Sequence, residues 1–127
     1  MRLLLDTHIF LWALRDDRRL SKSTRLKIQR ADEVYVSSAS LWEITIKMRL
    51  KKLDANPKQL MNAIIESGFI ELPITGRHAI MTAELPDIHR DPFDRILVAQ
   101  AICEPLTLIT ADANLEEYSD LVELVDS

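Results

Sequence analysis

The chain has 127 residues, which is long enough to bury one hydrophobic core without disulfides and too short for two domains of ordinary size, so we expect a single domain over residues 1–127. An apolar fraction of 47% and a charged fraction of 28% are typical of a soluble globular protein. The net charge of −4 argues against a uniformly basic nucleic-acid-binding protein, and the single cysteine excludes an intrachain disulfide and a metal site built from thiolates.

The amino-terminal stretch over residues 3–14 is apolar, but Asp6 and His8 interrupt it. It is too short to cross a bilayer and lacks the layout of a signal peptide. Since a lone cysteine also fits a reducing compartment, we expect a cytoplasmic protein with no membrane segment.

The first half of the chain alternates short apolar runs with helical patterns. Residues 2–5 have the apolar run of a buried strand, and Asp6 then has the position of a helix cap. Pro57 and Gly68 have the positions of a first-turn proline and of a glycine that ends a helix. In chain order we predict a strand at 2–5, helices at 7–14 and 21–31, a strand at 34–36, and helices at 38–50 and 57–67.

The second half continues this alternation. We predict, in order, a strand at 69–72, a helix at 76–84 that Pro86 stops, a helix at 92–103, and strands at 106–109 and 121–125. Strands separated by helices favour right-handed crossovers between parallel strands. The predicted fold class is therefore α/β, a three-layer α/β/α arrangement with a central parallel sheet of about five strands.

Four acidic residues map to one edge of this sheet. Asp6 directly follows the first strand, and Asp112 closely follows the fourth. Glu43 lies early in the helix after the second strand, and Asp94 lies in the first turn of the helix that leads back to the fourth strand. All four positions belong to the carboxyl edge of the sheet, where proteins of this class bind their ligands.

Each of these acids also has a purely structural interpretation. Asp6 and Asp112 have the positions of helix caps, and Ser40 with Glu43 has the spacing of a capping box. Residues 91–94 fit an N-cap, an N1 proline and an N3 acid that the helix dipole favours. Taken one at a time, the acids favour this interpretation.

Taken together, the four acids favour a metal site. Asp6 and Glu43 lie within strongly apolar segments, where a capping serine or glutamine would cost less to bury. Carboxylates that converge repel one another unless a cation neutralises them, and an all-oxygen set suits Mg²⁺ or Mn²⁺. The three histidines lack the paired spacing of a zinc site. The predicted chemistry is hydrolysis of a phosphodiester by metal-bound water.

Four sequence blocks, spread over nearly the whole chain, resemble the PIN-domain nucleases and, within them, the VapC-type toxins of toxin–antitoxin pairs. The blocks are LLLDTHIFLWAL with Asp6 and Thr7, SSASLWEITIKMRLKKL with Glu43, HRDPFDRILVAQA with Asp94, and TADANL with Thr110 and Asp112. The order and spacing of the blocks carry the resemblance, because any one block alone would be weak evidence for the family. In the third block Asp91 is the alternative to Asp94, and we prefer Asp94 because an apolar helix follows it directly.

The resemblance implies a PIN-like domain over residues 1–127 that acts as a Mg²⁺- or Mn²⁺-dependent endoribonuclease, the toxin of a type II pair. The catalytic and metal-binding residues that it implies are Asp6, Glu43, Asp94 and Asp112. It also implies an RNA substrate, a homodimer, and a cognate antitoxin that blocks the acidic pocket. Free toxin would arrest growth by cleaving RNA needed for translation.

Three alternative functions fit parts of the same pattern. A non-catalytic module could use the acidic pocket to hold a basic peptide. A phosphoacceptor receiver domain has a similar length and fold, but here the first strand is followed by the single Asp6 and the third by residues 73–75 (PIT), which include no aspartate. A nuclease for DNA flaps or single strands would need insertions for which this chain has little room.

Several other residues invite functional interpretations. Residues 18–30 include six basic residues and no acid, which makes them a candidate contact for the RNA backbone, with a solvated helix face as the alternative. Residues 47–52 include four more basic residues. Arg95 could reach a scissile phosphate or pair with Asp91 or Asp94 at the surface. Trp42 could stack on bases, but we expect it to pack in the core.

Overall fold

A five-stranded parallel sheet forms the centre of the computed structural model, which describes residues 1–126. The strands are β1 (Arg2–Leu5), β2 (Glu33–Ser37), β3 (Ile70–Leu72), β4 (Thr107–Thr110) and β5 (Val122–Leu124). Their order is β3-β2-β1-β4-β5, and each neighbouring pair is parallel. Receiver domains have the order 2-1-3-4-5, so the strand order argues against that alternative.

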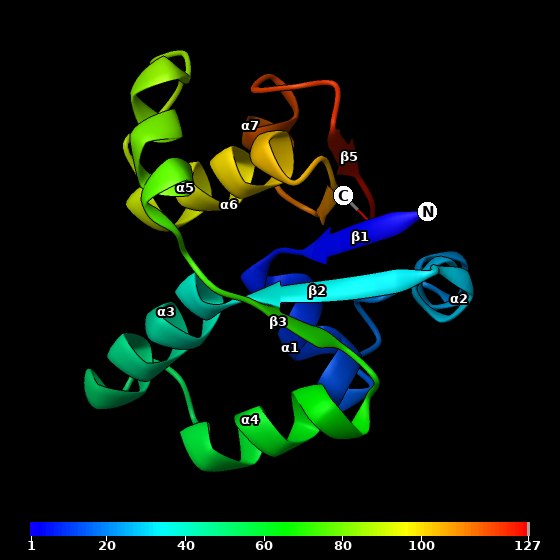
Figure 1. Ribbon diagram of the computed structural model, residues 1–127. Coiled ribbons are helices and arrows are strands. Elements are labelled where there is room, and N and C mark those ends of the chain that lie inside the picture. The colour runs from blue at the N-terminus through cyan, green and yellow to red at the C-terminus, as the bar shows by residue number, and fades with distance from the viewer. Residues whose placement is uncertain (127) are drawn as a thin grey trace.

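Helices cover both faces of the sheet (Figure 1). One face carries α1 (Thr7–Arg15), α2 (Lys22–Arg30) and α4 (Pro57–Glu66). The other carries α5 (Gly76–Met81), the 3-10 helix η1 (Thr82–Glu84), α6 (Pro92–Cys103) and α7 (Ala113–Glu116). Helix α3 (Ser38–Arg49) starts where β2 ends and packs against α1, α4 and α6. The three-layer α/β/α prediction is confirmed.

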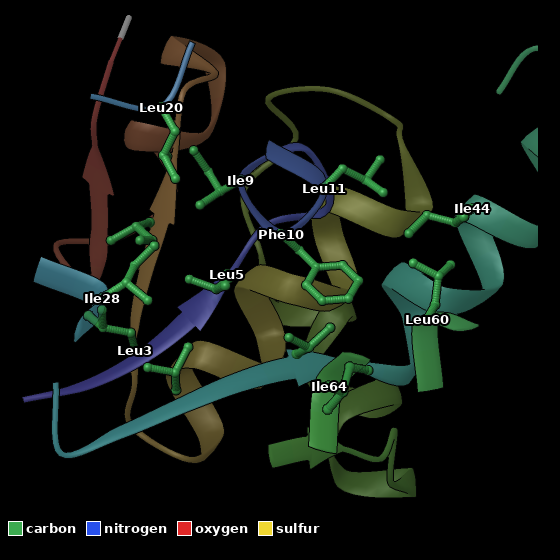
Figure 2. Packing of buried hydrophobic residues seen from close by; sticks show 13 residues of the cluster. Leu3, Leu5, Ile9, Phe10, Leu11, Leu20, Ile28, Ile44, Leu60 and Ile64 are labelled. Carbon is green, nitrogen blue, oxygen red and sulfur yellow. The ribbon is translucent and has the colours of Figure 1, made fainter. Parts of the chain in front are cut away.

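Strand β1 lies in the middle of the sheet, and its side chains alternate between the two faces. Leu3 and Leu5 belong to the hydrophobic cluster that packs under α1, α2 and α4, where Figure 2 shows them with Phe10 and Ile64. Leu4 belongs to the opposite cluster, under α6 and α7. All three leucines are fully buried, and each such burial stabilises the fold by about 2 kcal/mol. A strand covered on both faces explains the unbroken apolar run in this part of the sequence.

The predicted elements agree with the observed ones to within a few residues. Gly68 follows α4 with a φ of 75°, a left-handed conformation that glycine adopts without strain. The predicted helix over residues 76–84 is divided into α5 and η1. The sequence does not predict α7, because four residues are too few for a recognisable periodicity. None of the helices in residues 1–126 combines the length and the apolar character needed to span a bilayer.

Candidate active site

The structure brings the four predicted acids to the carboxyl edge of the sheet. Asp6 follows β1 as the N-cap of α1, and Asp112 follows β4 as the N-cap of α7. Glu43 lies in the second turn of α3, and Asp94 lies in the first turn of α6. Burial and then, in decreasing order, the charges of Asp91, Glu43, Asp112 and Asp6 raise the pKa of Asp94 to about 7. The other four carboxylates are therefore close enough to Asp94 to disfavour its ionised form.

Asp6 is the most buried of the four acids, with only 5% of its surface exposed. Its Oδ1 accepts a hydrogen bond from the Ile9 amide at 2.8 Å, which confirms the predicted capping role. Its Oδ2 accepts a hydrogen bond from the Thr110 hydroxyl. Burial raises the pKa of Asp6 even though these two hydrogen bonds act in the opposite direction. A nearby cation would therefore stabilise the ionised form of this side chain.

Glu43 is also buried, and two neighbours bind its carboxylate. The Thr7 hydroxyl lies 2.7 Å from Oε1, and Lys47 Nζ lies 2.8 Å from Oε2. The capping-box interpretation of Ser40 and Glu43 is wrong, because α3 begins at Ser38 and its N-cap is Ser37. Helix capping therefore does not explain Glu43. The role of Lys47 was missed from sequence, although its i,i+4 spacing from Glu43 is a recognisable helix ion-pair signal.

Asp91 and Asp94 have different local environments. Asp91 is the N-cap of α6, and its Oδ1 accepts hydrogen bonds from the amides of Phe93 and Asp94 at 2.9 and 3.2 Å. Across residues 1–126 no donor reaches the Asp94 carboxylate within hydrogen-bond distance, and His89 Nε2 lies 3.8 Å from its Oδ2. Within the described residues both oxygens of Asp94 and only Oδ2 of Asp91 are without a hydrogen bond, and our preference for Asp94 over Asp91 stays a prediction.

Thr110 joins two of the acids through one hydroxyl group. Besides donating to Asp6, its Oγ1 accepts a hydrogen bond from the Asp112 amide at 3.0 Å. The Asp112 carboxylate is exposed, and its Oδ1 accepts the Asn114 amide at 2.9 Å. From sequence, Thr110 was noted only as part of a family motif, since nothing local shows that it contacts Asp6.

The fit of a metal ion to this cluster can be judged from its donors. Within residues 1–126 no three acidic, histidine or cysteine side chains are placed together so as to hold one ion. The chemistry of the donors nevertheless fits a hard divalent cation, because all four acids offer oxygen atoms. The raised pKa values of Asp6 and Asp94 show that two of them lack a compensating positive charge.

Two side chains near the acids differ from expectation. Arg95 pairs with neither Asp91 nor Asp94 and instead donates to the carbonyl oxygens of Thr82 and Pro86, both at 2.9 Å, so it fastens the segment before α6. Trp42 is 60% exposed, so the expectation of core packing is wrong. It lies on the outer side of α3, edge-on to Phe93 with 5.3 Å between ring centroids.

The basic stretch at 18–30 lies away from the acids. Figure 1 shows α2 near the amino ends of β1 and β2, the opposite edge of the sheet. Three basic side chains of the stretch 18–30 form ion pairs within the fold: Arg19 with Asp17, Arg25 with Asp16, and Lys27 with Glu123. The structure therefore favours the alternative of a solvated helix face over contacts to RNA bound at the acids.

Comparison with known families agrees with the fold and the resemblance. The family model described as "PIN domain" matches residues 3–121. Ribonuclease VapC22 of Mycobacterium tuberculosis is 28% identical over 117 residues, covering 91% of this chain and 90% of the relative.

Several solved structures have the same fold, and one of them is a toxin–antitoxin complex. VapBC2 from Rickettsia felis, bound to a promoter DNA fragment, has a TM-score of 0.71 at 18% identity and covers 98% of both chains. A toxin–antitoxin complex from Klebsiella pneumoniae has a TM-score of 0.67 at 20% identity, with 95% of both chains covered. Mycobacterium tuberculosis VapC20, a sarcin–ricin loop cleaving toxin, has a TM-score of 0.61 at 18% identity and covers 93% of this chain and 97% of its own. At these identities the similarity establishes the fold.

Proposed function

We propose, since this chain belongs to the PIN-domain family, that it is a metal-dependent endoribonuclease and the toxin of a type II toxin–antitoxin pair. The observation that carries the proposal is the group of mutually repelling carboxylates around Asp94 at the carboxyl edge of the sheet. The relative Ribonuclease VapC22 supports RNA as the substrate. We also propose that residues 1–127 form one PIN-like domain and that the protein acts in the cytoplasm.

In this proposal Asp6, Glu43, Asp94 and Asp112 hold Mg²⁺ or Mn²⁺. A bound divalent cation supplies Lewis-acid activation of water and neutralises charge on the phosphodiester. The chain prepares the carboxylates: Thr110 orients Asp6, and Thr7 with Lys47 orients Glu43. Burial of Asp6 and Glu43 excludes water from one side of the cluster, which strengthens their interaction with a cation.

The proposal is tested by incubating total cellular RNA with antitoxin-free protein and Mg²⁺ or Mn²⁺. We expect discrete products from the wild type and from Asp91→Asn, and none from Asp94→Asn purified in the same way. Asp91→Asn is the matched control, because it removes a carboxylate only three residues from Asp94 and keeps a capping side chain. Equal cleavage by wild type and Asp94→Asn would point to a contaminant and contradict the proposal.

A cognate antitoxin is the proposed partner. A protein of the same fold is solved as a toxin–antitoxin complex, which supports this assignment. The acidic edge of the sheet would attract a basic segment, since such a segment relieves the same repulsion that a cation relieves. Addition of the antitoxin is then expected to abolish cleavage and to lower the affinity for Mn²⁺.

A homodimer is the proposed assembly, and an exposed apolar groove supports it. The groove has a volume of about 480 Å³, lies between α3, α5 and α6, and is lined in part by Trp42, Ile74 and Phe93. Ile80 on α5 is 76% exposed. Apolar side chains gathered on one face are typical of a protein interface, and a second copy of the chain would cover them.

Sedimentation analysis tests the assembly. The double variant Trp42→Glu/Ile80→Glu is expected to be monomeric at concentrations where the wild type is dimeric. Ile65→Glu is the matched control, because Ile65 is 74% exposed but lies on α4, and we expect it to leave the dimer intact. If Ile65→Glu dissociates the dimer and the double variant does not, the interface lies at α4 instead.

A non-catalytic acidic pocket is the second candidate function. The observation in its favour is that no three side chains of residues 1–126 are placed to hold one ion. Titration with Mn²⁺ distinguishes the two functions. If the protein binds no Mn²⁺ at millimolar concentration, the result would favour a non-catalytic pocket that holds only a basic peptide.

A further inference from the structure

His89 has a buried ring nitrogen without a hydrogen-bond partner. His89 lies in the segment before α6. Its Nε2 is shielded from solvent and neither donates nor accepts a hydrogen bond within residues 1–126. A buried polar atom left in this state costs about 1–3 kcal/mol, so native proteins keep such an atom only for a reason. The Oδ2 of Asp94 lies 3.8 Å from this nitrogen, just beyond hydrogen-bond distance.

The backbone of Asp91 determines which nitrogen of His89 carries the proton. The Asp91 amide donates to His89 Nδ1 at 3.3 Å, so Nδ1 must offer a lone pair. The neutral ring then carries its hydrogen on Nε2, the nitrogen near Asp94. The group that faces Asp94 is therefore an N–H donor.

Tyr118 and Arg95 hold His89 in this position. The Tyr118 hydroxyl lies 3.1 Å from both the amide nitrogen and the carbonyl oxygen of His89, and its ring packs edge-on against the imidazole. Arg95 Nη1 lies 3.3 Å from the same hydroxyl. Such support from a neighbouring helix and loop keeps the donor in place whether or not Asp94 uses it.

We propose that His89 is a positioning residue for Asp94. Its Nε2–H binds one oxygen of the Asp94 carboxylate and leaves the other oxygen to the divalent cation. The inference rests on the proposed function, since it assumes that Asp94 is a metal ligand. Donors behind a carboxylate ligand fix its orientation and typically change metal affinity by about 10- to 100-fold.

The test is Mn²⁺ affinity measured by titration calorimetry on wild type, His89→Leu and His89→Gln. We expect His89→Leu to weaken Mn²⁺ binding by about tenfold or more. His89→Gln should restore most of the affinity, because its side-chain amide nitrogen can replace Nε2 as the donor. Thermal melting verifies that each variant is folded.

If His89→Leu does not fold, Tyr118→Phe provides the second variant, since it keeps the ring and removes only the hydroxyl that holds the His89 backbone. It should weaken Mn²⁺ binding in the same direction and by less. Unchanged affinity in the folded His89 or Tyr118 variants, or equal losses in His89→Leu and His89→Gln, would overturn the inference while leaving the proposed function intact. A wild type that binds no Mn²⁺ would overturn the metal-dependent function and this inference with it.

Discussion

The hydroxyl of Thr110 organises the candidate site at the scale of a single residue. It donates to the buried carboxylate of Asp6 and accepts the backbone amide of Asp112, so one oxygen atom links the first and fourth acids. The hydrogen bond also lowers the pKa of Asp6, against the larger effect of burial. A residue that offers no carboxylate of its own can therefore influence both the position and the charge of an acid.

Replacing Thr110 with valine tests this role, because valine keeps the shape and removes the hydroxyl. We expect a loss of stability of about 1–2 kcal/mol, since Asp6 Oδ2 loses its donor in a buried setting. RNA cleavage should fall by an order of magnitude or more at neutral pH and recover partly at higher pH, because the pKa of Asp6 rises further. Thr110→Ser retains the hydroxyl and should retain the activity; activity that survives in Thr110→Val and is lost in Thr110→Ser would show that the methyl group, not the hydrogen bond, matters.

The pKa of Asp94 predicts how the stability of the metal-free protein depends on pH. Between the ordinary value of 3.8 and the folded-state value of about 7, the folded state binds a proton that the unfolded state has released. The contribution of Asp94 to stability is therefore fully present below pH 4 and is lost as the pH rises through 7. Asp94→Asn should melt at a higher temperature than wild type at pH 8 in EDTA and at nearly the same temperature at pH 4. A lower melting temperature for the variant at pH 8 would contradict the assignment of repulsion at this site.

At the scale of an element, the start of α6 divides its two acids between capping and the candidate site. Asp91 lies outside the first turn and satisfies amides that the helix leaves free, whereas Asp94 lies inside the turn, and its carboxylate has no hydrogen-bond donor among residues 1–126. Pro92 between them suits the first helical position because that position needs no amide donor. One short motif therefore serves both folding and the site.

Asp91 variants separate these roles. Asp91→Ala should lower stability by about 1 kcal/mol through loss of the cap, and Asp91→Asn should lower it by much less. Mn²⁺ affinity should survive in Asp91→Asn, measured beside Asp94→Asn in the same buffer. Loss of Mn²⁺ binding in Asp91→Asn with retention in Asp94→Asn would reverse our assignment of the third acid.

The elements of the fold follow from local signals, whereas much of the site's detail does not. Apolar runs and helix periodicity predict the five strands and most helices, and the parallel topology then brings the acids to one edge. The contact of Thr110 with Asp6 depends on segments 104 residues apart. Trp42 is exposed because of the face of α3 that packs against other elements. In the same way, the carbonyl partners of Arg95 depend on the face of α6 that packs against neighbouring segments. Such choices are made by tertiary packing, so periodicity alone could not reveal them.

At the scale of the whole molecule, the fold concentrates negative charge at one edge of the sheet. A cation bound there stabilises the folded chain by mass action, since the unfolded chain has no assembled site. We therefore expect Mn²⁺ to raise the melting temperature, and to raise it more at pH 8 than at pH 5.5, because protons compete for Asp94 below its pKa of about 7. Sodium chloride at the same ionic strength controls for screening of the acids; an equal Mn²⁺-induced shift in Asp94→Asn would indicate a site elsewhere.

The position of β1 has a consequence for the moment at which the protein is made. This strand leaves the ribosome before the other four, yet it is the central strand and pairs with β4. Asp6 contacts Thr110, which comes 104 residues later in the chain. The four acids cannot gather until synthesis has passed Asp112, so under the proposed function a nascent chain does not yet cut RNA. A proposed ribonuclease that assembles its site this late spares the messenger and the ribosome that are producing it, and leaves time for an inhibitory partner to be made.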